Sequence, residues 1–190
     1  MLKKMRGFTL IELLIVVAII GILAALLIPN ALEAIQKAKQ KSAMKEIVTI
    51  ATACADYMTD HGDFSLIMGD SGPLDSATNG IYVALASFYV KVIPLMDPWN
   101  FPYDIYLGVD AVTPIVSGAD PLELGDDDFV IVSYGRDKGV GPTYDSTLYT
   151  PTTPEAGRYN VSKMADFNED LVNWNGSWIV GPRTTLVAAS

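Results

Sequence analysis

The most constraining feature of the sequence is an apolar run near its start, from Phe8 to Ile28. The run has 21 residues. At about 1.5 Å of rise per residue, a helix of this length covers about 31 Å, the hydrocarbon thickness of a bilayer. Lys3, Lys4 and Arg6 precede the run, and positive residues favour the cytoplasmic side. We therefore expect a single membrane-spanning helix with everything after it on the far side.

One acidic residue, Glu12, lies inside this run. A carboxylate at mid-membrane costs about 2.5 to 3.5 kcal/mol on insertion scales, and less near the interface, so we expect Glu12 to have a partner. A secretory signal peptide has a shorter apolar region with a small-residue cleavage site on its far side, and a plain anchor has no reason for an internal acid. Glu12 fits neither of these two classes.

The residues from Lys3 to Glu12 read KKMRGFTLIE, which resembles the leader of type IV pilins and pseudopilins. The resemblance implies that a prepilin peptidase cleaves between Gly7 and Phe8 on the cytoplasmic face, and that the new amino group of Phe8 is methylated. The chain then consists of a cleaved leader (1–7), a transmembrane and assembly helix (8–29), an amphipathic helix (30–61) and a head outside the cytoplasm (62–190).

Charge pairing independently supports this interpretation. Cleavage before Phe8 leaves a free amine about one helical turn from Glu12, and in a filament the amine of one subunit can instead meet Glu12 of a neighbour. The two charges then cancel. Removing one partner of a buried pair costs about 3 to 5 kcal/mol, so the pair also fixes the register between subunits.

Pro29 predicts a kink rather than the end of the helix, because the helical pattern resumes at once. We count it with Phe8 and Glu12 among the residues that shape assembly. Beyond it the apolar residues follow one stripe at helical steps, which includes Ile35, Met44, Ile47, Ala51, Cys54 and Met58. One helix is expected over about residues 8 to 60, and Gly62 marks its end.

The rest of the chain predicts a small α+β head, and the resemblance implies a type IV pilin-like fold. Residues 65–80 are rich in turn formers, and residues 81–92 predict a short helix, with a strand as the alternative. Residues 103–107 and 129–134 predict strands, and the second strand alternates its two faces. A small antiparallel sheet packed on the amphipathic half of the long helix is the simplest architecture.

Three segments of the head are similar to the major pseudopilin of type II secretion. They are DPWNFPY at 97–103, VSYGRDKG at 132–139 and DLVNW at 170–174, with insertions around 109–127 and 143–167. The N-terminal helix carries the resemblance strongly, and the head carries it in these separate segments.

In that family the loop after the second strand binds calcium, so the resemblance implies a structural calcium site here. The matching positions are the carboxylates of Asp137 and Asp170, with the main-chain carbonyls of Tyr134 and Val140. A hard cation that takes six to eight oxygens suits such a mixture. Lys138 stands where the family usually has glycine. The alternative is that both aspartates are solvated turn residues.

Other candidate residues have simpler explanations. Cys54 is the only cysteine, so no intrachain disulfide can form, and we expect it to be a buried helix residue. His61 is the only histidine and is expected at an exposed helix end. The run Asp126–Asp128 is expected to be solvated. The aromatic residues of the second half are expected to pack the sheet: Tyr134, Tyr144, Tyr149, Tyr159, Trp174 and Trp178.

Charge and composition argue against two classes of function. The chain has 13 basic and 22 acidic residues, and without the three leader cations the imbalance is about −12, which repels a phosphate backbone. We expect no nucleic-acid partner. One histidine, one cysteine and no nucleophile elbow argue against an enzyme.

The resemblance implies a structural subunit of a type II secretion pseudopilus, which grows from the inner membrane and helps drive folded proteins through the outer-membrane secretin. Its expected partners are copies of itself, membrane lipid, the prepilin peptidase, an inner-membrane assembly platform with its ATPase, and minor pseudopilins. The expected location is the inner membrane with a periplasmic head and filament. The alternative is a subunit of a surface pilus for adhesion, motility or electron transfer.

Overall fold

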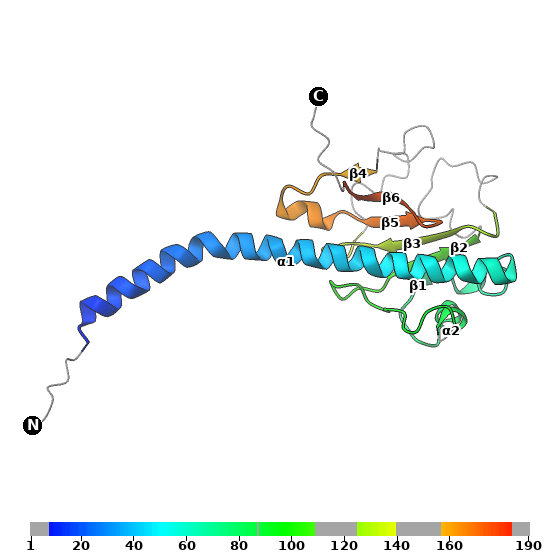
Figure 1. The fold of residues 1–190 in the computed structure, drawn as a ribbon, viewed down its shortest axis with the longest axis horizontal. Coiled ribbons are helices and arrows are strands. Elements are labelled where there is room, and N and C mark those ends of the chain that lie inside the picture. Colours follow the sequence, from blue (N-terminus) through cyan, green and yellow to red (C-terminus); the bar gives the residue numbers. More distant parts are fainter. Residues whose placement is uncertain (1–7, 87, 109–124, 140–156, 184–190) are drawn as a thin grey trace, which may run out of the picture.

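The computed structural model describes residues 8–86, 88–108, 125–139 and 157–183. One long helix, α1 (Leu10–His61), carries a folded head along its C-terminal half, while its N-terminal half extends away from the head (Figure 1). The other elements are η1 (Met68–Asp70), β1 (Gly72–Pro73), α2 (Gly80–Leu85), β2 (Asp104–Leu107), β3 (Phe129–Ser133), β4 (Arg158–Tyr159), η4 (Met164–Asn168), β5 (Leu171–Trp174) and β6 (Ser177–Pro182).

Helix α1 continues through Pro29 without a break and contains 52 residues. Figure 1 shows that it changes direction after its dark-blue first part, in agreement with the position of Pro29. Proline lacks the N–H of its turn, and its ring crowds the preceding carbonyl, which bends a helix that packing and sequence otherwise maintain. The helix ends at His61, and the C-cap Gly62 has a left-handed φ of 87° and donates its N–H to Met58 O at 2.7 Å. The prediction of one long helix is confirmed.

The two halves of α1 differ in burial. Buried side chains begin at Gln40 and end at Tyr57, all on the face toward the head. The apolar residues of the first half are exposed on every face. Of the helices in the described part of the chain, α1 is long and apolar enough to cross a membrane, and none of its most apolar stretch is buried. A helix that is apolar on all sides needs lipid or protein around it.

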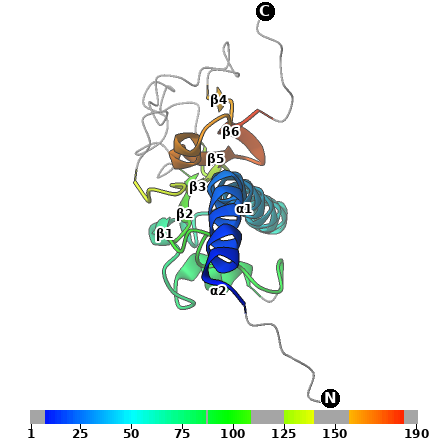
Figure 2. The same ribbon diagram turned by 90° about the vertical axis from the view of Figure 1, so that its left-hand side faces the viewer.

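The described strands form one six-stranded sheet in the order β1-β2-β3-β5-β6-β4. All neighbours are antiparallel except β4 and β6, which are parallel. Figure 2 looks along α1 and shows β4, β5 and β6 on one side of the helix and α2 on the other. The two strands predicted at 103–107 and 129–134 are confirmed to within one residue at an end, and the sheet is mostly antiparallel as predicted.

The sheet buries both of its faces. On β3, Phe129 and Ile131 belong to the main core with α1, whereas Val130 and Val132 belong to a second cluster on the opposite face. Helix α1 contributes mostly small and branched side chains to the main core: Ala43, Ile47, Ile50, Ala51, Ala53, Cys54 and Tyr57. The predicted packing role of the aromatic residues holds for Tyr134, Tyr159 and Trp174 in the second cluster and for Trp178 in the main core. Tyr144 and Tyr149 lie outside the described residues.

The helix predicted over 81–92 is wrong beyond Leu85. Helix α2 begins after Asn79, whose side chain accepts a hydrogen bond from the N–H of Ile81 at 2.9 Å. It ends at Ala86, which has an extended backbone and forms a β-bridge with Val90. The aromatic and β-branched residues that follow lose side-chain freedom in a helix, which weakens its continuation.

Candidate processing and assembly site

The first turn of α1 is built around Thr9 and Glu12. Thr9 is the N-cap, with an extended backbone at φ −87° and ψ 150°. The N–H of Glu12 donates to Thr9 Oγ1 at 3.3 Å, and the N–H of Thr9 donates to Glu12 Oε2 at 2.8 Å. The Thr9 hydroxyl donates to the same Oε2 at 2.7 Å. This reciprocal capping box satisfies two N–H groups that the start of a helix would leave open.

Glu12 therefore has a partner inside its own chain, and sequence reasoning missed it. The signal was present, because Thr9-Leu10-Ile11-Glu12 has the spacing of a capping box. Thr9 thus belongs to the site. The hydrogen bonds lower the cost of the carboxylate but leave its negative charge uncompensated, so a cation nearby would still be favourable.

The predicted cleavage position lies directly before this turn. Phe8 precedes the N-cap and is 75% exposed, while Gly7 lies outside the described residues. An amine created at Phe8 would be one residue from the Thr9 N–H that already bonds Glu12. Cleavage between Gly7 and Phe8 stays a prediction.

The loop after β3 carries two of the predicted metal residues. Tyr134 is half-buried, and its hydroxyl donates to Asp104 Oδ2 at 2.6 Å. Asp137 is exposed, and its Oδ1 accepts a hydrogen bond from the N–H of Gly139 at 3.3 Å. Val140, the expected carbonyl ligand, lies outside the described residues. Lys138 has a φ of 61°, a left-handed conformation that glycine adopts most easily.

The segment that carries Asp170 packs against this loop, although a long insertion separates them in the sequence. The N–H of Arg136 donates to Phe167 O at 2.9 Å. Gly135 approaches the segment so closely that a Cβ there would lie 2.8 Å from Glu169 O. Asp170 is fully buried beside these contacts. The structure thus brings the two expected segments together, with main-chain carbonyls between them.

Side chains alone do not form a metal centre in the part of the chain that the structure describes. No group of three or more His, Cys, Asp or Glu side chains is close enough there to hold an ion. In the run after Gly125, Asp126 and Asp127 are exposed as predicted. The prediction of a solvated side chain is wrong for Asp128. It is buried and accepts hydrogen bonds from the N–H of Gly125 at 2.7 Å and from the side-chain amide of Asn175.

Asp97 organises the DPWNFPY segment. It is buried, and its Oδ1 accepts hydrogen bonds from the N–H groups of Trp99 and Phe101, both at 3.0 Å. Its Oδ2 accepts from the Ser133 hydroxyl at 2.8 Å. Burial raises the pKa of Asp97, although these hydrogen bonds act in the opposite direction. Since the Trp99 indole N–H also bonds Gln36 of α1 at 2.8 Å, the segment is a structural tie between loop, sheet and helix.

The two remaining candidates occupy the predicted positions. Cys54 is fully buried on α1, and desolvation raises the pKa of its thiol to about 12, so the thiol stays protonated. His61 is exposed at the last position of α1 and stacks on Tyr57, with ring centroids 4.1 Å apart.

A bare apolar half-helix, an acid-capped first turn and a sheet packed on the second half of the same helix define the class of type IV pilin-like subunits. The model of the prokaryotic N-terminal methylation motif matches residues 2–28.

The chain is similar to type II secretion system core protein G of Escherichia coli (strain K12), with 30% identity over 144 residues that cover 71% of this chain and 94% of that protein. It is similar to the protein of the same name from Pseudomonas aeruginosa, with 34% identity over 139 residues, 66% of this chain and 91% of that protein. It is also similar to the type IV major pilin protein PilA of Myxococcus xanthus, with 32% identity over 192 residues, 93% of this chain and 84% of that protein. No solved structure gives a significant match. The chain belongs to the type IV pilin and pseudopilin family that includes type II secretion core protein G.

Proposed function

We propose that the chain is a structural subunit of a type II secretion pseudopilus, a filament that grows from the inner membrane and helps drive folded proteins through the outer-membrane secretin. The observation that carries this proposal is the exposed apolar half of α1 with Glu12 in its first turn. Such a helix is stable in lipid before assembly and against other copies of itself afterwards. The relatives named type II secretion system core protein G support the assignment to secretion.

The proposed topology follows from the N-terminal charges. Lys3, Lys4 and Arg6 favour a cytoplasmic N-terminus and hence a periplasmic head. A prepilin peptidase on the cytoplasmic side would remove residues 1–7 and leave the amine of Phe8. In the filament this amine pairs with Glu12 of a neighbouring copy, which compensates the charge that the capping box leaves in place.

Further partners follow from the same proposal. An inner-membrane assembly platform and its ATPase would extract subunits from the membrane into the filament, and minor pseudopilins would begin it. The role is structural rather than catalytic, as it is for the pilin and pseudopilin relatives.

We also propose that the head binds one structural calcium ion at the loop after β3. The bond from Arg136 to Phe167 and the close approach of Gly135 to Glu169 support it, because they bring a loop rich in main-chain oxygens to the segment of Asp170. Asp137 and Asp170 would supply carboxylates, and Tyr134 and Val140 would supply carbonyls. A cation would hold the two segments together in a head that has no disulfide.

A surface type IV pilus is the second candidate, because the chain is also similar to the Myxococcus major pilin over 93% of its length. A retraction ATPase encoded nearby and visible surface fibres would favour the pilus. A secretin and an assembly ATPase without retraction machinery would favour secretion.

The test is complementation of a deletion strain, with secreted proteins measured inside and outside the cell. The wild-type gene should release proteins that the deletion traps in the periplasm. Glu12→Leu should insert into the membrane normally but restore neither filaments nor secretion, because the amine of Phe8 loses its counter-charge. Glu33→Leu, which removes a partly exposed carboxylate beyond the membrane span of the same helix, is the matched control and should restore both. Normal filaments from Glu12→Leu would contradict the pairing.

A further inference from the structure

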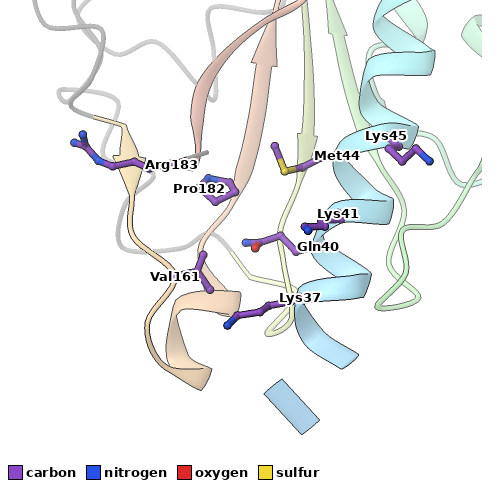
Figure 3. A pocket seen from close by; sticks show the side chains of 8 residues that line it. All are labelled: Lys37, Gln40, Lys41, Met44, Lys45, Val161, Pro182 and Arg183. Atoms are coloured by element: carbon purple, nitrogen blue, oxygen red, sulfur yellow. The ribbon is translucent and has the colours of Figure 1, made fainter. Parts of the chain in front are cut away.

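A groove of about 570 Å³ runs between the start of the buried part of α1 and the end of β6. Its apolar lining comes from Met44 on one wall and from Val161 and Pro182 on the other (Figure 3). Lys37, Lys41 and Lys45 border it on the α1 side, and Arg183 borders it beside the end of β6. An apolar floor with a basic rim is unusual for a chain with a net charge of −9 and suits an acidic, partly apolar partner.

The lysines of this basic groove are available to a partner. Lys41 is exposed and makes no ion pair with any carboxylate among the described residues. Lys37 pairs with Glu33 at 2.7 Å, but the two side chains are 50% and 34% exposed, and such an i,i+4 pair is worth only a few tenths of a kcal/mol. A better-desolvated carboxylate could replace Glu33 at little cost.

The opposite end of α1 carries a surface with complementary properties. Asp56 and Asp60 are exposed there, one helical turn apart. Beside them Leu66 and Phe88 are each 79% exposed, an unusual exposure for such large apolar side chains on a head. We call these four residues the acidic tip. Asp60, Leu66 and Phe88 line the same shallow depression.

The two lysines and the two aspartates have the same spacing along α1. Lys37 and Lys41 are four residues apart, as are Asp56 and Asp60, and each lysine precedes its acidic counterpart by the same number of residues. At about 1.5 Å per residue the separation along α1 is about 28 Å, so within one copy the groove and the tip cannot meet. A parallel copy displaced by this distance would align both lysines with both aspartates at once.

We infer that the basic groove of one copy receives the acidic tip of another copy in the filament, with Lys37 near Asp56 and Lys41 near Asp60. The inference rests on the proposed filament and names its contact between heads. The contact joins two different surfaces, and repeated contacts of this heterologous kind produce open helical assemblies rather than closed dimers. The displacement has the same direction as the one that brings the amine of Phe8 to Glu12. It is several times longer, so the two contacts join different pairs of copies.

Anionic lipid is a poorer occupant of the groove. Lys37 follows Ile28, the end of the apolar run, by about 13 Å of helix, and Lys41 by about 20 Å. The headgroup region adds only about 5 to 8 Å to each side of the hydrocarbon layer. Lys41 therefore lies beyond the lipid surface when the apolar run spans the membrane.

Charge reversal in cells that assemble the filament tests the inference. Lys41→Glu and Asp60→Lys should each reduce filament yield to about a tenth of the wild-type yield or less, because like charges then face each other across the contact. The two substitutions combined in one chain should restore at least half of the yield. Lys39→Glu, which makes the same charge change on α1 outside the groove, should leave the yield unchanged.

Disulfide trapping provides a direct reading of the contact. A chain with Lys41→Cys and Asp60→Cys should form ladders of cross-linked copies in oxidised filaments. A chain with either substitution alone should give no cross-linked species larger than a dimer. Cys54 is buried and will not interfere. A chain with Lys39→Cys and Asp60→Cys is the matched control and should form no ladder.

The outcomes separate the two proposals. If the wild-type chain forms no filaments, the proposed function fails. If it forms filaments but Lys41→Glu assembles normally, or the combined reversal gives no rescue and no ladder appears, only the contact between groove and tip is wrong. If Lys41→Glu assembles normally but loses binding to vesicles that contain anionic lipid, the groove is a lipid site and the inference is overturned.

Discussion

At the scale of single residues, Glu12 has two tasks. Its carboxylate closes the first turn of its own helix through Thr9, and in the proposed filament it would remain negative for a neighbour's amine. The first task explains how one subunit tolerates the acid before assembly. The second explains why the acid lies inside an apolar run at all, since a neutral side chain such as glutamine would also fit a capping box.

Asp97 permits a prediction about the stability of the head. Asp97→Ala should lower the free energy of unfolding by about 1 to 3 kcal/mol, because the N–H groups of Trp99 and Phe101 lose their acceptor in a buried site. Asp97→Asn keeps an acceptor oxygen and should cost less. Urea denaturation of the purified chain in detergent measures both. Equal, negligible losses would show that the turn does not depend on this side chain.

The same residue gives a pH dependence. Burial raises the pKa of Asp97 in the folded chain above its unfolded value of 3.8, so the folded state binds this proton more tightly. Its unfavourable contribution is complete at neutral pH and is relieved as the pH falls through the folded pKa toward the unfolded one. Wild type should therefore gain stability relative to Asp97→Asn as the pH falls from 7 into this acidic range. A constant difference would contradict the raised pKa.

At the scale of elements, the β5–β6 hairpin depends on its two-residue turn. Asn175 and Gly176 have φ values of 47° and 83°, the two left-handed positions of a turn that matches the twist of the strands. The turn is tied to β3, because Asn175 Oδ1 accepts from the N–H of Phe129 at 2.9 Å. It therefore fixes both the register of the hairpin and its place in the sheet.

Gly176→Ala should destabilise the head by about 1 to 2 kcal/mol, because a Cβ disfavours the left-handed conformation. A Cβ at Gly176 would meet no atom within 4 Å, so the loss should be conformational and not steric. Gly139→Ala is the control, since Gly139 is equally open and lacks a left-handed φ. Thermal unfolding measures both, and equal melting temperatures for the two variants would contradict the argument.

Sequence patterns predicted the long helix, because an apolar run, a resumed helical stripe and a terminal glycine all agree on it. They failed at residues 86–92, where helix and strand propensities are nearly balanced and the β-bridge at Ala86 decides the conformation. The local pattern around Phe8 and Glu12 predicted cleavage and charge pairing there, and both stay predictions. The contact between Gly135 and Glu169, and the burial of Asp128, depend on the packing of distant segments that local spacing does not encode.

At the scale of the whole molecule, α1 belongs to two environments. Its first half is exposed and would lie in the membrane and then in the core of the proposed filament, whereas its second half packs against the head. The bend near Pro29 separates the two parts. A subunit of this form can leave the lipid and enter a filament without refolding its head, because the buried part of α1 begins only at Gln40.

The proposed calcium site would join two segments of the head that are far apart in the sequence. Calcium at millimolar concentration should raise the melting temperature of the full chain in detergent by a few degrees relative to chelator, as expected for about 1 kcal/mol of ligand stabilisation. Magnesium should give less. Asp137→Asn should abolish the difference, and Asp127→Asn, an exposed residue of the acidic run, should keep it. No response to chelator would remove calcium from the account.

The mature N-terminus decides whether an amine at Phe8 exists to pair with Glu12 of a neighbouring copy. Mass spectrometry of the protein from membranes and filaments should find a terminal peptide that begins at Phe8 and carries an N-methyl group. The amine that neutralises Glu12 in a neighbouring copy would then exist. A mature protein that still begins at Met1, or that is cut on the far side of Ile28, would contradict it.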